Sequence, residues 1–451
     1  MSVLPFYVVP LTHPEWEEAL ASASRLPAEA MPELRLDLFP DQDPAEMVRA
    51  LRHRCVVTHR RSSEGGRWDG PEDARLARLL AAAEARPAWV DLEWDVEIPP
   101  LLRNLRSHLR LIRSVHVQPG VFDLTERLAA LPEGEAYKWV GHAGTLADNA
   151  RLKSALAWAR DRGIALSAFL MGPKGIASRC LQAVWGGAFT YAAPDDGPPA
   201  APGQLPLSIM RAWRVHKLTR AYGLCGVLGS PVLHSKGPGF HNPRFQAAFK
   251  DLLYLPLDCQ GAEEAQEALA ALPLLAASLT APLKETLPPL LGLQGPLNTL
   301  WRREPGQPWR SANTDAIALQ DALARLTPGP VLLLGGGGVA RTTEQVLEAT
   351  GRPCLRVSRK EPVPPAAVAA FAPVGAIQAT SLGMAPDAPM PFPEHLAAAQ
   401  PTLRWGVEWI YKEDTAFARW ARSEGLAVVE GAALFEGQAL AQSKAFIEGC
   451  G

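Results

Sequence analysis

The first half of the chain alternates strand-like apolar runs with helix-forming segments. Between residues 1 and about 210, eight short runs are apolar or alternate between apolar and polar residues. Helix-forming segments such as PEDARLARLLAAAEA and DNARLKSALAWARDRG separate many of them. The runs are FYVVPL (6–11), ELRLDL (33–38), CVVTHR (55–60), WVDLEW (89–94), LRLIRSVHV (109–117), YKWVGHA (137–143), ALSAFLMG (165–172) and AFTYAA (188–193). This alternation predicts a parallel α/β fold, and eight strands favour a closed (β/α)8 barrel over an open sheet.

A second alternation starts at Tyr222 and predicts another α/β unit, built from two lobes. Its strand-like runs are LCGVLG, LLYLPLD and AASLTAPLK, then, after a turn-rich stretch to Asp315, VLLLGGGGVAR, CLRVSRK, AIQATSLGM and VEWIY. The Pro- and Gly-rich segment 194–206 precedes the last predicted barrel helix, so we interpret it as an active-site loop and place the boundary near 215–222. We predict a barrel at 1–215, a substrate-binding lobe at 222–320, and a cofactor-binding lobe at 321–451 whose last helices return to the first lobe.

Composition narrows the class of protein. Apolar residues make up 47% of the chain and charged residues 20%, which is typical of soluble globular proteins. Lys and Arg (45) nearly balance Asp and Glu (47), and no long basic run is present. Nucleic-acid binding is therefore not expected, and small-molecule chemistry is.

The sequence also carries no membrane, targeting or metal pattern. The longest uncharged stretch, 268–283, contains Pro273 and is shorter than the roughly 20 residues of a spanning helix. The N-terminus lacks a basic region before its apolar run, so we expect a cytoplasmic protein with no membrane partner. The six cysteines form no C-x-x-C pair and the histidines no H-E-x-x-H, which predicts reduced thiols and no metal site.

A glycine-rich turn points to a dinucleotide. The strand 330–335 runs into GGGGVAR (335–341), which fits G-x-G-x-x-G/A before a helix; a tight packing turn is the alternative. The predicted cofactor contacts there are Gly335, Gly336, Gly337, Gly338, Val339 and Ala340. The next strand ends in Ser358, Arg359 and Lys360, where a basic pair suits the 2′-phosphate of NADP. Glu361 follows directly and keeps NAD as an alternative.

Two charged residues upstream suggest carbonyl chemistry. Lys284 follows a predicted strand and Asp315 follows a turn, each among small polar residues. Lys284 could donate a proton to a carbonyl oxygen with Asp315 as its partner, although each residue alone is more often a surface charge.

Residues 222–446 resemble the shikimate dehydrogenase family. The matched blocks are GVLGSPVLHS (226–235), HN (241–242), LTAPLK (279–284), GPLNT (295–299), NTD (313–315), GGGGVAR (335–341), ATSLGM (379–384) and GAALFEGQ (431–438). The resemblance implies that Lys284 and Asp315 form the catalytic pair. It also implies substrate contacts by Ser235, Gly237, Thr280, Asn298, Asn313, Tyr411 and Gln438, and further cofactor contacts by Thr380 and Gly431.

Two positions depart from that family's pattern. Gly237 stands where the family's S-x-S-P has its second serine, and Ser278 stands where the family usually has asparagine. Loss of a hydroxyl donor at position 237 predicts a pocket that admits quinate, whose C1 carries a hydroxyl, besides shikimate.

The predicted barrel has candidate chemistry at its strand ends, which form the catalytic face of this fold. Lys138 lies between aromatic and aliphatic neighbours, where burial would favour the neutral amine that attacks a ketone, and His116 could move protons. A lysine extending to solvent and a core histidine are the alternatives.

Residues 5 to about 212 resemble type I 3-dehydroquinate dehydratase. The blocks are ELRLD (33–37), THR with EGG (58–60, 64–66), DLEWD (91–95), SVH (114–116), YK (137–138), MGPKGIASR (171–179), FTYA (189–192) and APGQ (201–204). The resemblance implies that Lys138 is the Schiff-base lysine, His116 the general base, and Glu64 the acid that orients it. The implied substrate contacts are Glu33, Arg35, Arg60, Met171, Arg179, Tyr191 and Gln204. After His116, Val117 and Gln118 replace the usual acidic and aromatic residues, which predicts altered loop packing.

The two resemblances imply consecutive reactions of one pathway: dehydration of 3-dehydroquinate, then reduction of 3-dehydroshikimate by NADPH. One alternative is a dehydratase fused to a quinate dehydrogenase. Another is a quinate-sensing regulator without catalysis, which the presence of Lys138, His116, Lys284 and Asp315 disfavours. The sequence sets no expectation for the oligomeric state.

Overall fold

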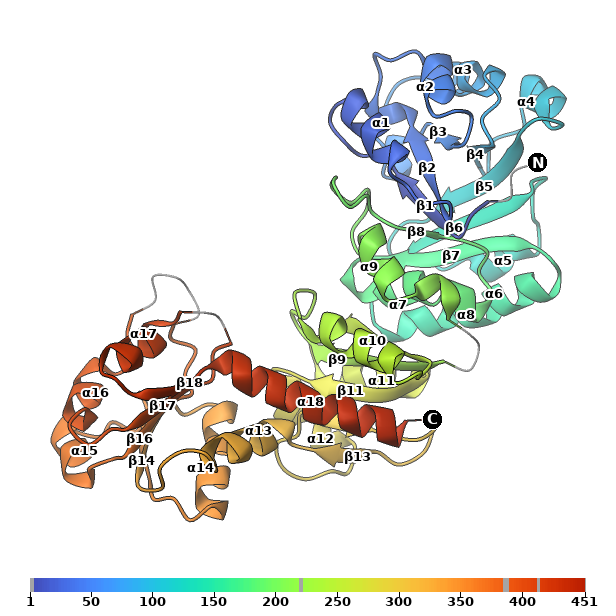
Figure 1. The fold of residues 1–451 in the computed structure, drawn as a ribbon. Helices are drawn as coiled ribbons and strands as arrows, with labels where there is room; N and C mark the ends of the chain where they lie inside the picture. Colours follow the sequence, from blue (N-terminus) through green and yellow to red (C-terminus); the bar gives the residue numbers. More distant parts are fainter. Residues whose placement is uncertain (1–3, 219–221, 384–388, 412–413, 451) are drawn as a thin grey trace.

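The computed structural model describes residues 4–218, 222–383, 389–411 and 414–450, and Figure 1 shows their arrangement. Residues 219–221 of the predicted boundary and Met384 of the predicted block 379–384 lie outside these ranges, as do 1–3, 385–388, 412–413 and 451.

The first half forms a parallel eight-stranded barrel, as the alternation predicts. The sheet order is β7-β6-β5-β4-β3-β2-β1-β8. The strands are β1 (Tyr7–Pro10), β2 (Ala30–Arg35), β3 (Val56–Thr58), β4 (Trp89–Glu93), β5 (Arg110–His116), β6 (Ala136–His142), β7 (Ala165–Met171) and β8 (Thr190–Tyr191). The seam between β7 and β8 is crossed by a hydrogen bond from Ala188 N to Leu166 O (2.8 Å) and by Ser167 Oγ, which donates to Phe189 O (2.7 Å).

Helices cover the outside of this barrel, and apolar side chains fill its interior. The helices are α1 (Trp16–Ser24), α2 (Pro44–Ala50), α3 (Glu72–Glu84), α4 (Pro100–Leu105), α5 (Leu124–Leu128), α6 (Arg151–Asp161), α7 (Ile176–Cys180), α8 (Gln182–Trp185) and α9 (Leu207–Ala212). Val8, Ile112 and Phe169 belong to the buried interior cluster, so the barrel is a packed core with its polar groups at the strand ends.

The second half contains two further sheets, in agreement with the two predicted lobes. The first has the order β10-β9-β11-β12-β13 and the second β15-β14-β16-β17-β18. The first lobe contains β9 (Gly223–Gly229), α10 (Gly237–Ala247), β10 (Leu252–Asp258), α11 (Ala262–Ala271), β11 (Leu274–Leu279), α12 (Leu283–Leu290), β12 (Thr299–Trp301) and β13 (Arg310–Ala312). The second contains β14 (Val331–Leu334), α14 (Gly338–Ala349), β15 (Cys354–Val357), α15 (Pro365–Phe371), β16 (Gly375–Gln378), α16 (Pro393–Ala399), β17 (Trp405–Glu408), α17 (Ala416–Ser423) and β18 (Ala427–Val429).

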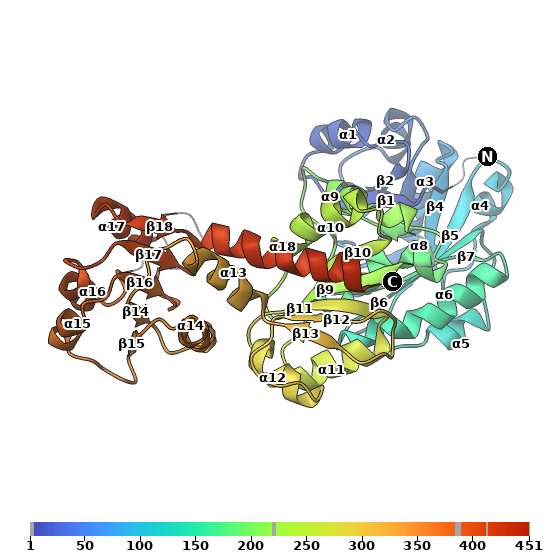
Figure 2. The same cartoon turned by 60° about the horizontal axis from the view of Figure 1, so that its bottom comes forward.

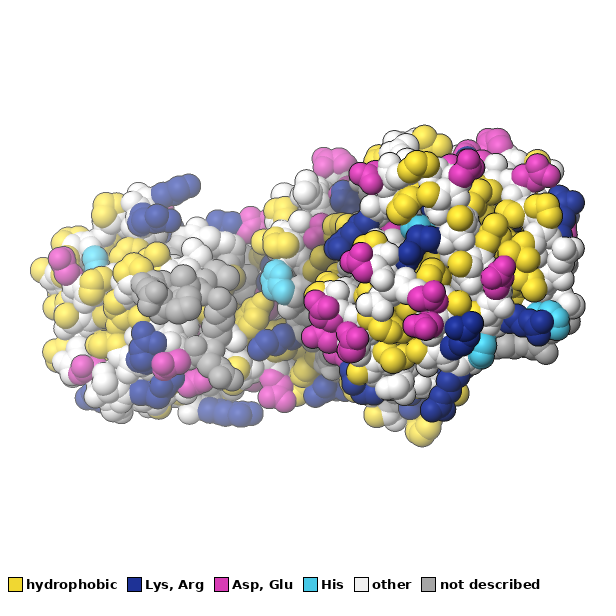
Figure 3. Space-filling model, turned by 90° about the horizontal axis from the view of Figure 1, so that it is seen from above, with side chains coloured by type: hydrophobic (Ala, Val, Ile, Leu, Met, Phe, Trp, Pro, Cys, Tyr) yellow, Lys and Arg dark blue, Asp and Glu magenta, His cyan; other side chains and the backbone are white. Residues whose placement is uncertain are grey.

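Two helices join these lobes. Helix α13 (Thr314–Leu323) packs along α18 (Gly431–Gly449), and α18 runs from the second lobe back across the first (Figure 2). The view in Figure 3 shows the second lobe set off by a narrower waist, with charges of both signs interspersed over this face.

The structure differs from the sequence prediction in two local features. The turn-rich stretch before Asp315 holds the short antiparallel pair β12 and β13. The run 276–284 is not one strand, because β11 ends at Leu279 and Lys284 lies in the first turn of α12.

The barrel and the first lobe share an apolar core and an ion pair. One buried cluster includes Trp185 of the barrel and Leu257 of β10. Lys174, which follows β7, has its Nζ 2.6 Å from Glu264 Oε1 of α11. The same oxygen accepts a hydrogen bond from Leu146 N (3.3 Å), in the loop after β6. Glu264 therefore contacts two loops on the catalytic face of the barrel.

The six cysteines are free thiols, and five of them are buried. Within the described ranges, none of the helices combines the length and apolar character needed to cross a membrane.

Two candidate active sites

The barrel has a cavity of about 370 Å³ at the C-terminal ends of its strands. All ten barrel residues singled out in the sequence line it: Glu33, Arg35, Arg60, Glu64, His116, Lys138, Met171, Arg179, Tyr191 and Gln204. Gln204 comes from the segment 194–206, which precedes α9 and borders the cavity as predicted.

Lys138 is buried among polar partners at the centre of this cavity. Its Nζ lies 2.5 Å from Asp91 Oδ2, 3.2 Å from Tyr191 Oη and 3.8 Å from Glu33 Oε1. The aromatic neighbours in the sequence, Tyr137 and Trp139, belong instead to the cluster outside the barrel, because successive strand residues face opposite sides. The apolar environment predicted for Lys138 is therefore wrong: its amine faces carboxylates.

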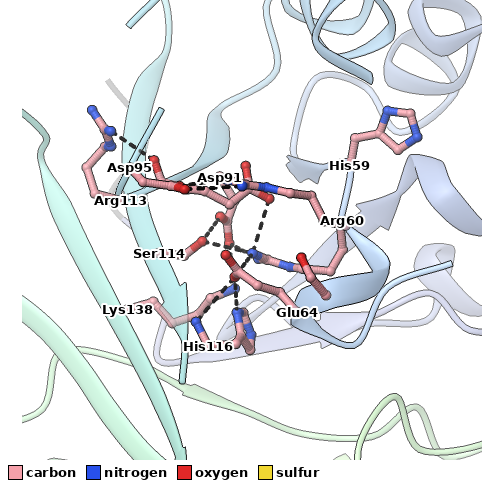
Figure 4. A network of polar contacts seen from close by, with 12 residues as sticks. His59, Arg60, Glu64, Asp91, Asp95, Arg113, Ser114, His116 and Lys138 are labelled. Atoms are coloured by element: carbon pink, nitrogen blue, oxygen red, sulfur yellow. Dashed lines mark hydrogen bonds and ion pairs between the residues drawn. The ribbon is translucent and has the colours of Figure 1, made fainter. Parts of the chain in front are cut away.

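Arg60 holds the carboxylates of Asp91 and Glu64 in place (Figure 4). Its guanidinium contacts Asp91 Oδ2 (3.1 Å), Glu64 Oε2 (3.1 Å) and Ser114 Oγ (3.1 Å). Burial alone would raise the pKa of Asp91, but the charges of Lys138 and Arg60 hold that pKa below its usual value. Asp91 stays ionised beside the lysine. Asp91 lies in the matched block 91–95, for which the sequence indicated no role.

His116 and Glu64 form a second unit in the cavity. His116 Nδ1 lies 2.9 Å from Glu64 Oε2, and the backbone N of His116 donates to the same oxygen (3.2 Å). If Nδ1 carries the proton, Nε2 is left as a base. Burial, with the charges of Arg60 and Lys138, lowers the pKa of His116 well below 6.5, so the imidazole is neutral near pH 7. Gln118 Nε2 donates to Ser63 O (3.2 Å) and ties the loop after His116 to the turn that carries Glu64.

Arg179 is a buried cation without a polar partner among the described residues. It is 1% exposed, all three guanidinium nitrogens lack a hydrogen bond, and Cζ lies 4.4 Å over the Phe169 ring. Burial lowers the pKa of Arg179 to about 10. A buried guanidinium without a counter-charge is costly, and a bound carboxylate would supply that charge.

The second cavity, of about 260 Å³, lies where the first lobe meets the second. It is lined by the predicted residues Ser235, Gly237, Thr280, Lys284, Asn298, Asp315, Val339, Tyr411, Gly431 and Gln438. Lys284 Nζ lies 2.5 Å from Asp315 Oδ2, so the structure brings these two residues together. Both come from the first turns of helices, α12 and α13.

Asn313 lies in an adjoining cavity, which is lined also by Gly338. Both polar atoms of its side-chain amide already have hydrogen-bond partners within the protein. Its side-chain oxygen caps α13 by accepting from Ala316 N (3.2 Å), and Nδ2 donates to Pro296 O (3.0 Å). Sequence reasoning missed His241, Tyr254 and Gln442, which also line the second cavity.

A third hollow fits a dinucleotide. Gly335, Gly336, Gly337, Ser358, Arg359, Lys360 and Thr380 line it. A β-carbon on Gly335 would lie 2.7 Å from Ala379 O at φ +135°, so only glycine suits this turn. Gly338 opens the 12-residue helix α14, whose N-terminus attracts phosphate, while Ala340 is buried in the core.

Glu361 lines this hollow and Glu285 lines the adjoining cavity that contains Asn313, and each of the two has an arginine partner. Glu361 pairs with Arg356, so its carboxylate is engaged. Glu285, from the first lobe, accepts from Arg341 Nη2 of α14 (2.5 and 2.7 Å) and lies where a β-carbon on Gly338 would meet Oε1 at 2.6 Å. The first lobe thus reaches the start of α14.

These features define a two-part α/β protein with a lysine-centred barrel site and a dinucleotide-type site between two lobes. Residues 7–214 match the model of the type I 3-dehydroquinase family. Over 349 residues the chain is 27% identical to the chloroplastic bifunctional 3-dehydroquinate dehydratase/shikimate dehydrogenase of Arabidopsis thaliana, covering 68% of this chain and 57% of that relative.

Solved structures are also similar. Dehydroquinate dehydratase and shikimate dehydrogenase from S. pombe AroM matches 99% of this chain and 96% of its own at 20% identity and TM-score 0.41. Shikimate dehydrogenase of Aquifex aeolicus matches 51% of this chain and 93% of its own at 24% identity and TM-score 0.44.

Proposed function

We propose that this chain is a bifunctional enzyme that dehydrates 3-dehydroquinate to 3-dehydroshikimate and reduces that ketone to shikimate with NADPH. The observation that carries the proposal is the barrel cavity, where Lys138, the His116–Glu64 pair and the unpartnered Arg179 surround one space. The domain bounds proposed are 1–215 for the dehydratase, 222–320 for the substrate lobe and 321–451 for the cofactor lobe.

In the barrel, Lys138 Nζ passes one proton to a neighbouring carboxylate such as Asp91 (2.5 Å) and attacks the C3 ketone as the free amine. The ketone oxygen leaves as water, and an imine forms. The protonated imine is cationic, and Asp91 and Glu33 lie where they stabilise that charge. His116 then removes a proton from C2 and returns it to the departing C1 hydroxyl, which leaves as water. Hydrolysis of the imine releases 3-dehydroshikimate and frees Lys138.

Arg179 positions the substrate in this mechanism. The ring carboxylate would pair with its guanidinium, which has no other partner among the described residues. Tyr191 donates to Glu33 Oε1 (2.9 Å) and thereby fixes the carboxylate that faces Lys138.

In the second cavity, Lys284 donates a proton to the ketone oxygen and Asp315 holds its ammonium in place. NADPH, when bound, supplies the hydride for the ketone carbon. The residues proposed to hold it are the glycines at the start of α14, with Ser358, Arg359, Lys360 and Thr380 in the adjoining hollow. Arg359 and Lys360 are exposed there while Glu361 is paired with Arg356, which supports NADP over NAD.

The proposed compartment is the cytoplasm, which the six unpaired cysteines support.

The test of function is an assay on the full chain that follows two signals, enone absorbance and NADPH oxidation. Incubation with 3-dehydroquinate alone should raise the enone absorbance, and added NADPH should then be oxidised. A protein that produces no enone from 3-dehydroquinate would contradict the dehydratase, and one that oxidises no NADPH with added 3-dehydroshikimate would contradict the dehydrogenase.

A further inference from the structure

Tyr191 lies between Lys138 and Glu33 in the barrel cavity. Its hydroxyl oxygen is 3.2 Å from Lys138 Nζ and 2.9 Å from Glu33 Oε1, and all three side chains are buried. The rings of Phe169 and Phe189 pack against the phenol ring, with centroids 5.7 and 6.2 Å away, and hold it in this position. Lys138 Nζ and Glu33 Oε1 are 3.8 Å apart, too far for a direct hydrogen bond. The Tyr191 hydroxyl therefore connects the reactive amine to this carboxylate.

The groups at the two ends fix the direction of both hydrogen bonds. A carboxylate only accepts, so the phenol proton of Tyr191 points at Glu33 Oε1. An ammonium only donates, so Lys138 Nζ donates to Tyr191 Oη. The three groups form a chain, Nζ–H···Oη–H···Oε1, in which a proton can enter the phenol as another leaves it. Burial, with the charges of Glu33 and Asp91, raises the pKa of Tyr191 well above 10, so the phenol does not persist as a phenolate.

The two carboxylates near Lys138 differ in what surrounds them. Asp91 is nearer to Nζ, but Arg60 Nη2 (3.1 Å) and Ser114 Oγ also donate to this carboxylate. A proton on Asp91 would stand against the guanidinium of Arg60 and is readily returned. Among the described residues, no guanidinium lies within ion-pair distance of Glu33. Glu33 can therefore hold a proton that reaches it through Tyr191.

We infer that Tyr191 is a catalytic residue of the barrel, whose hydroxyl relays a proton from Lys138 to Glu33 and back while the imine forms. As one proton moves from Nζ to Oη, the phenol proton moves to Glu33 Oε1, which leaves a neutral amine and an unchanged phenol. The inference rests on the proposed dehydratase function and assigns a residue to its first step.

The relay accounts for every proton of the Lys138 ammonium. The first proton is held by Glu33 while the Nζ lone pair forms the bond to C3. The second moves from nitrogen to the former ketone oxygen, which becomes the hydroxyl of a carbinolamine. The proton on Glu33 then returns through Tyr191 to that hydroxyl, the C–O bond breaks, and water leaves. The third proton stays on the nitrogen of the cationic imine.

The first variant removes only the relay hydroxyl. Tyr191→Phe in the full chain keeps the ring, whose centroid lies 4.8 Å from Lys138 Nζ. It should lower dehydratase kcat by about ten- to hundredfold and change KM less than about twofold, because a proton-transfer group is lost. Rapid mixing with 3-dehydroquinate, a borohydride quench and mass spectrometry should show the same loss in the rate at which the Lys138 adduct appears.

A matched control and a second variant test the relay further. Tyr137→Phe should match wild type, because Tyr137 adjoins Lys138 in the chain but donates to Pro132 O (2.9 Å) outside the barrel. Glu33→Gln should slow adduct formation about as much as Tyr191→Phe, since an amide accepts the hydrogen bond but does not hold the proton. The double variant should be within about threefold of the slower single variant, because both residues act in one relay.

A wild-type rate of adduct formation in Tyr191→Phe, a loss confined to KM, or losses that multiply in the double variant would overturn the inference and leave the proposed function intact. A wild-type chain that forms no enone from 3-dehydroquinate would overturn the proposed dehydratase and this inference with it.

Discussion

The barrel cavity and the inter-lobe cavity hold their charged side chains in different environments. Lys138 and Arg60 are each 3% exposed, Lys138 on β6 and Arg60 two residues after β3 of the same sheet. The Lys284 side chain is 32% exposed, and its cavity is lined by residues of both lobes, such as Thr280, which follows β11, and Trp409, which follows β17. The first site is fixed by a single packed core, and the second depends on how α13 and α18 join two cores.

This difference has an energetic consequence. Coulomb interactions are strong in a buried network and are screened where water and salt reach the pair. The barrel can therefore shift pKa values strongly, as it does for His116, whereas the Lys284–Asp315 pair works nearer to solvent. Added salt should therefore weaken the Lys284–Asp315 interaction more than the ion pairs in the barrel cavity.

The largest expected effect separates the sites completely. Lys138→Ala should lower dehydratase activity by about a thousandfold or more and leave reduction of added 3-dehydroshikimate unchanged, because the imine cannot form. Lys284→Ala should do the reverse. Borohydride with 3-dehydroquinate should add the ligand mass to a peptide that contains Lys138. An adduct elsewhere, or loss of both activities in one folded variant, would show that the sites are not independent.

Next in size is the effect of removing the unpartnered cation of the barrel. Arg179→Met should lower dehydratase kcat/KM by about a hundredfold, since the ring carboxylate loses its charged partner. The same change should raise the melting temperature, because a desolvated charge without a counter-ion is replaced by an apolar side chain. Enone formation and thermal unfolding are the two measurements. A variant that is less stable than wild type would show that Arg179 has a structural role.

Cofactor choice should respond to a smaller, charge-assisted contact. Arg359→Ala should reduce the preference for NADPH over NADH by roughly ten- to hundredfold, as expected for about 1.5–3 kcal/mol. Lys217→Ala serves as the control, because it also removes a basic side chain but Lys217 does not line the hollow. Its cofactor preference should match that of wild type. Equal kcat/KM for both cofactors in wild type would instead point to Glu361 or another group as the determinant.

The smallest expected effect is on the pH profile of the barrel. The lowered pKa of His116 means that its basic, neutral form persists as pH falls from 7 to 6. Dehydratase kcat/KM should therefore stay flat in that range and fall about tenfold per pH unit only below the shifted pKa. A titration of the His116 ring followed by NMR should show the same midpoint. A midpoint at or above 6.5 would contradict the burial argument.

Local pattern was enough to predict the eight barrel strands, because each is an apolar run bounded by turns or helices. The hairpin of β12 and β13 was missed, since strands of three residues carry too few positions to show a period. Strand-end position already singled out Lys138 and His116, and the family resemblance gave these and the other site residues their roles. Their strand-end positions alone left surface and core alternatives open.

Contacts between residues that lie far apart in the chain could not be predicted from the local pattern or from the family resemblance. Asp91 meets Lys138 across 47 positions, and Ser278 meets Gln442 across 164. Whether a polar strand residue faces a lysine or a solvent-filled space depends on barrel closure. The partner of Ser278 depends in turn on where α18 crosses the first lobe.

The contact between Glu264 and the two barrel loops bears on how sequence variation in this chain would be interpreted. Glu264 belongs by position to the proposed dehydrogenase, yet it holds Lys174 and Leu146 in the loops that follow the strands of Met171 and Lys138. Sorting variants by domain would assign Glu264→Lys to the proposed reduction step. Its first expected effect is nevertheless a weaker dehydratase, because Glu264 supports the two loops that follow the barrel strands of Met171 and Lys138.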